Sequence, residues 1–201
     1  MQKIMPCLWF DGRAEEAVKF YTSVFKRSKK GDVTRYGDAG PGPKGSVMTA
    51  TFQIEGQEFM ALNGGPEFKF TPAVSFIVHC KSQKRVDYYW DKLMEGGGAP
   101  QQCGWLTDKF GVSWQIVPTI VPRLMTDKDK QKRERVMQAL LKMVKLDVGE
   151  LKRAAKGPKA APAPADATDS GKKDKDKRQK KDKDKKAKAP KDPAAKGTPT
   201  L

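Results

Sequence analysis

The chain has 201 residues, of which 40 are Lys or Arg and 24 are Asp or Glu, so its formal net charge is +16. Its three cysteines lie far apart, which argues against a disulfide framework and against a zinc cluster. No apolar run approaches the roughly 20 residues that cross a bilayer, and acidic residues follow too early for a signal peptide. We therefore expect a cytoplasmic protein.

The first third of the chain predicts a strand, a helix and three further strands. The apolar segment Ile4–Phe10 is typical of a buried strand. Apolar residues at three- and four-residue spacing over Ala14–Phe25 indicate an amphipathic helix. Strands are then expected at Asp32–Gly37, Ser46–Ile54 and Glu58–Leu62.

The same order of elements returns in the next part of the chain. Ala73–His79 is a second apolar strand rich in branched and aromatic residues. Ser82 is a candidate N-cap of a helix that the run Glu95–Pro100 ends. Gln101–Thr107 and Val112–Val117 then predict a hairpin around a tight turn.

A shift of 68 residues superposes the two helices and aligns Val18 with Val86 and Tyr21 with Tyr89. The fold class expected is therefore α+β, with two tandem β-α-β-β-β modules at residues 1–66 and 71–122 forming one domain, 1–122. Because each sheet alone has an unburied face, the modules are expected to pair around a cavity between curved sheets.

Two further regions follow this domain. Residues 123–155 predict a helical extension, in which an apolar stripe over Val136–Val144 suits docking onto the domain or a partner subunit. Asp147 is a candidate cap of its final helix. Residues 156–201 carry 15 Lys and Arg against 7 Asp and Glu, a net of +8 and half of the total, and lack aromatic residues. This tail is expected to be disordered.

The tail allows two interpretations, which the sequence leaves open. Its lysines over Lys172–Lys191 suit nonspecific, salt-sensitive contact with nucleic acid or an anionic membrane. The interleaved aspartates lower its charge density and suit a solubilising segment instead.

Four segments of the chain resemble the PhnB-like branch of the vicinal oxygen chelate superfamily, which includes glyoxalase and bleomycin resistance proteins. This branch is often described as a demethylubiquinone methyltransferase domain. The segments lie between residues 3 and 156 and read LWFDGRAEEAVKFYTSVF, PAVSFIVHCKSQKRVDYYWDKL, CGWLTDKFGVSWQIVPT and RVMQALLKMVKLDVGELKRAA. The resemblance implies paired modules and, commonly, a homodimer.

Enzymes of this superfamily hold a divalent metal with two His and two Glu from the first and fourth strand of each module. By position, the resemblance places these ligands at Pro6, at Val74 or Ser75, within Met60–Asn63, and at Gln115. None is an acid or a histidine, and an amide oxygen brings no charge to a cation. We therefore expect neither a metal nor another cofactor.

Methyl transfer is also not expected. A nucleotide-type cofactor commonly needs a Gly-rich turn that opens a helix, whereas the Gly-rich run Glu95–Pro100 follows a helix and ends in proline.

If the lost ligand positions mark the cavity face, strand alternation places Leu8 and Phe10 on that face and Trp9 and Trp114 beneath the helices. Apolar walls with a few amides suit a small uncharged or aromatic ligand. The candidate ligand-binding residues are Leu8, Phe10, Asn63, Trp105, Ser113, Gln115 and Val117.

His79, the only histidine, is a possible general base, but no second histidine or fixed acid accompanies it. An exposed strand end without a catalytic role is therefore favoured. Cys80 and Cys103 are expected to be small core residues rather than nucleophiles.

Three functions follow, and whether the protein is an enzyme stays open. The preferred function is binding of a small molecule between the sheets without a metal. One alternative is a nucleic-acid-associated dimer that acts through its basic tails. Another is a metal-dependent lyase or dioxygenase of the glyoxalase type.

Overall fold

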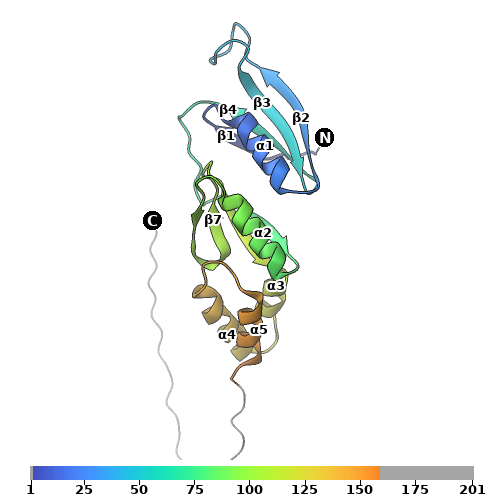
Figure 1. Ribbon diagram of the computed structural model, residues 1–201, viewed down its shortest axis with the longest axis vertical. Helices are drawn as coiled ribbons and strands as arrows, with labels where there is room; N and C mark the ends of the chain where they lie inside the picture. Colours follow the sequence, from blue (N-terminus) through green and yellow to red (C-terminus); the bar gives the residue numbers. More distant parts are fainter. Residues whose placement is uncertain (1, 159–201) are drawn as a thin grey trace, which may run out of the picture. The chain divides into compact units, whose positions relative to one another are not determined.

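The computed structural model describes residues 2–158, and the predicted basic tail lies outside them except for its first three residues. The N-terminal module comprises β1 (Cys7–Phe10), α1 (Ala14–Val24), β2 (Ser28–Arg35), β3 (Val47–Ile54) and β4 (Gln57–Asn63) (Figure 1). Its sheet has the order β1-β4-β3-β2. Strands β1 and β4 are parallel, and the other neighbours are antiparallel.

The C-terminal module repeats this plan. It comprises β5 (Ser75–Cys80), α2 (Gln83–Met94), β6 (Ala99–Pro100), β7 (Trp105–Thr107) and β8 (Ser113–Pro118). The sheet order β5-β8-β7-β6 matches the first sheet position by position, and β5 is again parallel to β8. The predicted tandem β-α-β-β-β fold is therefore confirmed, although β6 lies in a segment expected only to end a helix.

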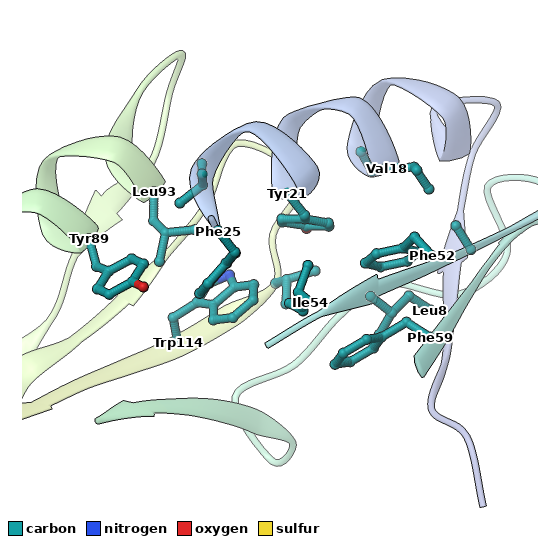
Figure 2. Packing of buried hydrophobic residues seen from close by; sticks show 14 of the residues in the cluster. Leu8, Val18, Tyr21, Phe25, Phe52, Ile54, Phe59, Tyr89, Leu93 and Trp114 are labelled. Atoms are coloured by element: carbon teal, nitrogen blue, oxygen red, sulfur yellow. The ribbon is translucent and has the colours of Figure 1, made fainter. Parts of the chain in front are cut away.

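The two modules pack together through their helices and the strand faces beneath them. The Phe25 ring lies 5.1 Å from the Tyr89 ring and 5.5 Å from the Trp114 ring, between centroids (Figure 2). The Tyr88 hydroxyl donates to the backbone carbonyl of Val24 at 2.8 Å. These side chains belong to one core cluster that extends through both modules. Burial of these large aromatic surfaces makes the main contribution to the free energy that holds the two modules together.

The predicted turn between β7 and β8 is present and carries a buried acid. The amide of Gly111 donates to the carbonyl of Asp108 at 2.9 Å, and Gly111 has a positive φ of 88° that favours glycine. The Asp108 carboxylate accepts hydrogen bonds from the Tyr21 hydroxyl and the Trp114 indole, both at 2.8 Å. It also accepts two backbone amides of its own turn. Asp108 thereby connects α1 to the C-terminal sheet.

Three helices follow the modules: α3 (Ile120–Met125), α4 (Lys130–Leu141) and α5 (Val148–Lys156). They share a second, smaller apolar cluster. Gln83 of α2 joins this extension to the C-terminal module, because its side chain accepts from the Val148 amide at 2.8 Å. Within residues 2–158, no helix is both long and apolar enough to span a membrane.

Candidate functional site

Each sheet has a helix face, which packs on α1 or α2, and an open face on its other side. The structure reverses the strand alternation predicted for β1. Leu8 and Phe10 are buried in the core cluster with Val18 of α1, so they lie on the helix face. Cys7 and Trp9 therefore take the open face, where the Trp9 indole donates to the Gly65 carbonyl at 2.8 Å.

On the C-terminal sheet the predicted alternation holds. Trp114 lies beneath the helices, bonded to Asp108, and its neighbours Ser113 and Gln115 point to the open face. The Gln115 amide donates to the Ser75 hydroxyl at 2.9 Å on that face.

The remaining candidates on this face are Trp105, which pairs with Gln115, and Val117, which pairs with His79. Ser113 is only 1% exposed. Within residues 2–158 its hydroxyl is the one buried side-chain oxygen or nitrogen without a hydrogen-bond partner.

Asn63, the seventh candidate, uses both the oxygen and the nitrogen of its side-chain amide in hydrogen bonds. Its side-chain oxygen accepts from the Ala14 amide at 2.9 Å, and its nitrogen donates to the Val47 carbonyl at 3.0 Å. The first of these bonds satisfies a donor at the start of α1, which has no intrahelical partner. Asn63 therefore holds α1 against the sheet, and it also borders a cavity of about 560 Å³.

The superfamily's metal does not fit the residues at its four positions. Pro6 offers no side-chain ligand, and the Asn63 side-chain oxygen already accepts from the Ala14 amide. Gln115 offers only a neutral amide oxygen, while its amide nitrogen donates to Ser75. Among residues 2–158, no group of three or more His, Cys, Asp or Glu side chains comes together. A divalent cation would meet only neutral oxygens here, which bind transition metals poorly.

The most suitable ligand site is a cavity of about 610 Å³ where the two modules meet, called here the intermodule cavity. The β3–β4 hairpin and the end of α1 form one side, and β5, α2 and β8 form the other. Five aromatic side chains make most of its wall: Phe25, Phe59, Phe76, Tyr89 and Trp114. None of the seven predicted residues lines it.

The polar groups of the intermodule cavity lie mainly on β5 and α2. They include His79, Lys81 and Arg85, with Glu55 on the hairpin side. The Arg85 guanidinium donates to the Tyr89 hydroxyl and lies over the Tyr89 ring, 4.5 Å from its centroid. Burial raises the pKa of Tyr89, so this hydroxyl stays neutral near physiological pH.

Sequence reasoning missed this site because most of its aromatic wall comes from helix-face positions, such as Trp114, which the alternation places in the core. One local signal was present. Arg85 and Tyr89 lie four residues apart, so they share one side of α2.

The single histidine and the three cysteines differ in their burial. His79 is exposed near the end of β5, as expected, although it borders the intermodule cavity. Cys80 is buried, and burial raises the pKa of its thiol to about 11, so it is a core residue and not a thiolate nucleophile. Cys103 is half-buried and Cys7 is exposed, and all three are free thiols.

Two four-stranded βαβββ modules with helices on one face define the vicinal oxygen chelate fold. Residues 2–117 match the family of 3-demethylubiquinone-9 3-methyltransferase proteins. The chain belongs to this PhnB-like family. The predicted family is thereby confirmed.

One solved structure agrees with this assignment, and two others are more distantly similar. A PhnB protein from Bacillus cereus is 42% identical, with a TM-score of 0.54, and the match covers 59% of this chain and 100% of that one. A Pseudomonas aeruginosa protein is 23% identical over 59% of this chain and 98% of its own, with a TM-score of 0.48. The fosfomycin resistance protein FosX from Listeria monocytogenes is 14% identical over 57% and 89%, with a TM-score of 0.40. None of the curated proteins matches this chain.

Proposed function

We propose that this PhnB-like protein binds a small organic molecule in the intermodule cavity without using a metal. The observation that carries the proposal is the cavity itself, whose volume of about 610 Å³ lies within the roughly 300–1,000 Å³ of ligand pockets. Apolar aromatic walls with a few convergent polar groups are typical of such pockets.

Methyl transfer, the activity in the family's name, has less support in this chain. The Gly-rich run after α2 uses the positive φ angles of Gly96 and Gly97 to end that helix. It does not open a helix toward a nucleotide. Ligand binding needs only the cavity, and we leave open whether a reaction follows.

Of the four candidates on the open face of the C-terminal sheet, Ser113 is buried, and we propose that the other three, Trp105, Gln115 and Val117, form a secondary contact surface. A second copy of the chain is the partner we propose, which gives a homodimer. The free thiols suit a reducing compartment, and we propose the cytoplasm.

Native mass spectrometry of protein purified without chelators tests the proposal, before and after mild denaturation. We expect a metal-free species that releases a small organic mass or gains one on incubation with 2-naphthamide, a neutral aromatic probe. The Ile77→Trp variant places an indole at the cavity and should bind less of that mass. Val74→Trp is the matched control, because Val74 is 71% exposed, lies three residues away and does not border the cavity.

Three outcomes would contradict the proposal. A stoichiometric transition metal would restore a glyoxalase-type mechanism. If both tryptophan variants lost the bound organic mass to the same extent, the loss would come from a general disturbance of the fold and not from a filled cavity. A polypeptide that neither carries nor gains an organic mass would remove the basis for a ligand site.

A further inference from the structure

The Arg85 guanidinium is the most unusual polar group of the intermodule cavity. It is half-buried and lies over two aromatic rings, 4.5 Å from the Tyr89 centroid and 5.0 Å from the Tyr88 centroid. Within residues 2–158 it makes no ion pair, and its one side-chain hydrogen bond is to the Tyr89 hydroxyl. Arginine offers five N–H donors in a planar fork, so most of them remain available.

The Tyr89 hydroxyl adds a second donor at the same place. Tyr89 is 4% exposed, and its oxygen accepts from Arg85. Its own proton has no acceptor among residues 2–158, since no hydrogen bond in that part of the chain has this hydroxyl as donor. The hydroxyl can therefore donate to an acceptor in the cavity while it still accepts from Arg85.

The charges around the cavity favour an anion. Lys81 and Arg85 contribute two cations, and neither is paired with an acid in the described residues. The one acid is Glu55, whose carboxylate is held by Arg27 on the hairpin side, at 3.1 Å between Oε2 and Nε. The cavity therefore presents cationic donors on the α2 side and aromatic rings elsewhere.

The aromatic walls set the shape of the apolar part. Phe76 contacts the Phe59 and Trp114 rings at 5.2 and 5.3 Å between centroids, and Phe25 continues this surface toward Tyr89. Planar walls of this kind favour a planar ligand body, because aromatic rings gain from stacked and edge-to-face contacts as well as from burial.

We propose that the intermodule cavity selects an aromatic carboxylic acid, with the carboxylate on Arg85 and Tyr89 and the ring among the aromatic walls. The carboxylate matches the guanidinium fork in a bidentate manner. Lys81 adds charge at the mouth of the site. This inference rests on the proposed function, since it names the ligand class of the same cavity.

Calorimetric titration of the full chain with 2-naphthoate and with 2-naphthamide tests the inference. The two probes share shape and differ in charge. Hydrogen bonds to charged groups imply that 2-naphthoate binds about tenfold or more tightly than the amide. Arg85→Gln should remove this preference and leave 2-naphthamide binding within about twofold. Arg123→Gln, an exposed arginine on α3, is the matched control and should change neither affinity.

A second variant protects the test against a folding defect in Arg85→Gln. Glu55→Gln removes the acid of the cavity, so it should tighten binding of 2-naphthoate and leave 2-naphthamide unchanged. Equal affinity for both probes in the native chain would overturn the carboxylate selection while the proposed ligand site stands. A preference that survives in Arg85→Gln would also overturn it, and failure of both probes to bind would overturn the ligand class and count against the site itself.

Discussion

Glu16 shows how single charged side chains on the surface can connect the two modules. Its carboxylate pairs with Arg13 of the same module and with Lys109 in the β7–β8 turn, both at 2.9 Å. The hydrogen bond from Arg13, followed by that from Lys109, lowers the pKa of Glu16 to about 2. The charged form is thus favoured in the folded state.

This shift predicts a specific pH dependence. Because the folded pKa lies below the ordinary value of 4.5, the stabilisation from Glu16 is present above pH 4.5 and is lost as the pH falls toward 2. We expect the difference in unfolding free energy between the native chain and Glu16→Gln to be small, since both partners are partly exposed. It should vanish only below pH 2 and should shrink in high salt. A carboxyl pKa near 4.5, measured by NMR, would contradict the prediction.

For single residues, the sequence predicted burial or exposure correctly where the neighbouring residues along the chain determine it. Cys80 is buried and His79 is exposed, as their neighbours in the sequence indicate. The role of Asn63 was not predictable, because its partners Ala14 and Val47 are distant in sequence and meet it only in the folded sheet.

At the scale of elements, periodicity predicted the helices well. The expected helix over Ala14–Phe25 is α1, and Ser82 occupies the N-cap position of α2, although its side chain makes no capping bond. Strand β1 shows the limit of the method. The sequence of a four-residue apolar strand is compatible with burial of either of its two faces. Only the packing of α1 decided that Leu8 and Phe10 face inward.

The predicted cap of the final helix is present and testable. The Asp147 carboxylate accepts from the Glu150 amide at 2.6 Å at the start of α5. We expect Asp147→Ala to destabilise the chain by about 1 kcal/mol, because an N-terminal donor of the helix loses its partner. Denaturant unfolding measures this change. Asp147→Asn is the control and should retain most of the stability, and a loss as large as that of alanine would argue against a capping role.

At the scale of the whole molecule, one buried acid joins the modules. Asp108 is 3% exposed, and burial raises its pKa although four hydrogen bonds to the carboxylate oppose that effect. Its bond from Tyr21 of α1 is a buried polar contact between the modules. Removing an acceptor from such a network leaves buried donors without partners.

We expect Asp108→Asn to destabilise the chain by about 2–3 kcal/mol, because an amide nitrogen accepts no hydrogen bond. Whichever way the amide is oriented, either Tyr21 and Trp114 or the two turn amides lose their acceptor. Urea unfolding at neutral pH measures the change. Tyr21→Phe, the comparison variant, removes one hydrogen bond and should cost about 1 kcal/mol. If Asp108→Asn were no more destabilising than Tyr21→Phe, the acid would not be the polar centre of the junction.

The sequence by itself determined the elements, their tandem order and the family. These depend on periodicity and on turn residues that lie close together along the chain. It also predicted that the superfamily's metal ligands are missing, because that prediction needs only residue identities at the positions that the resemblance implies.

The tertiary structure alone decided where the modules meet and which residues line a cavity. Phe25, Phe76 and Arg85 come from different elements and were indistinguishable from ordinary core or surface residues in the sequence. The physical reason is that a cavity forms from the mismatch in shape between packed elements. Local patterns fix which side of an element is apolar, but they do not fix how two apolar surfaces fit together.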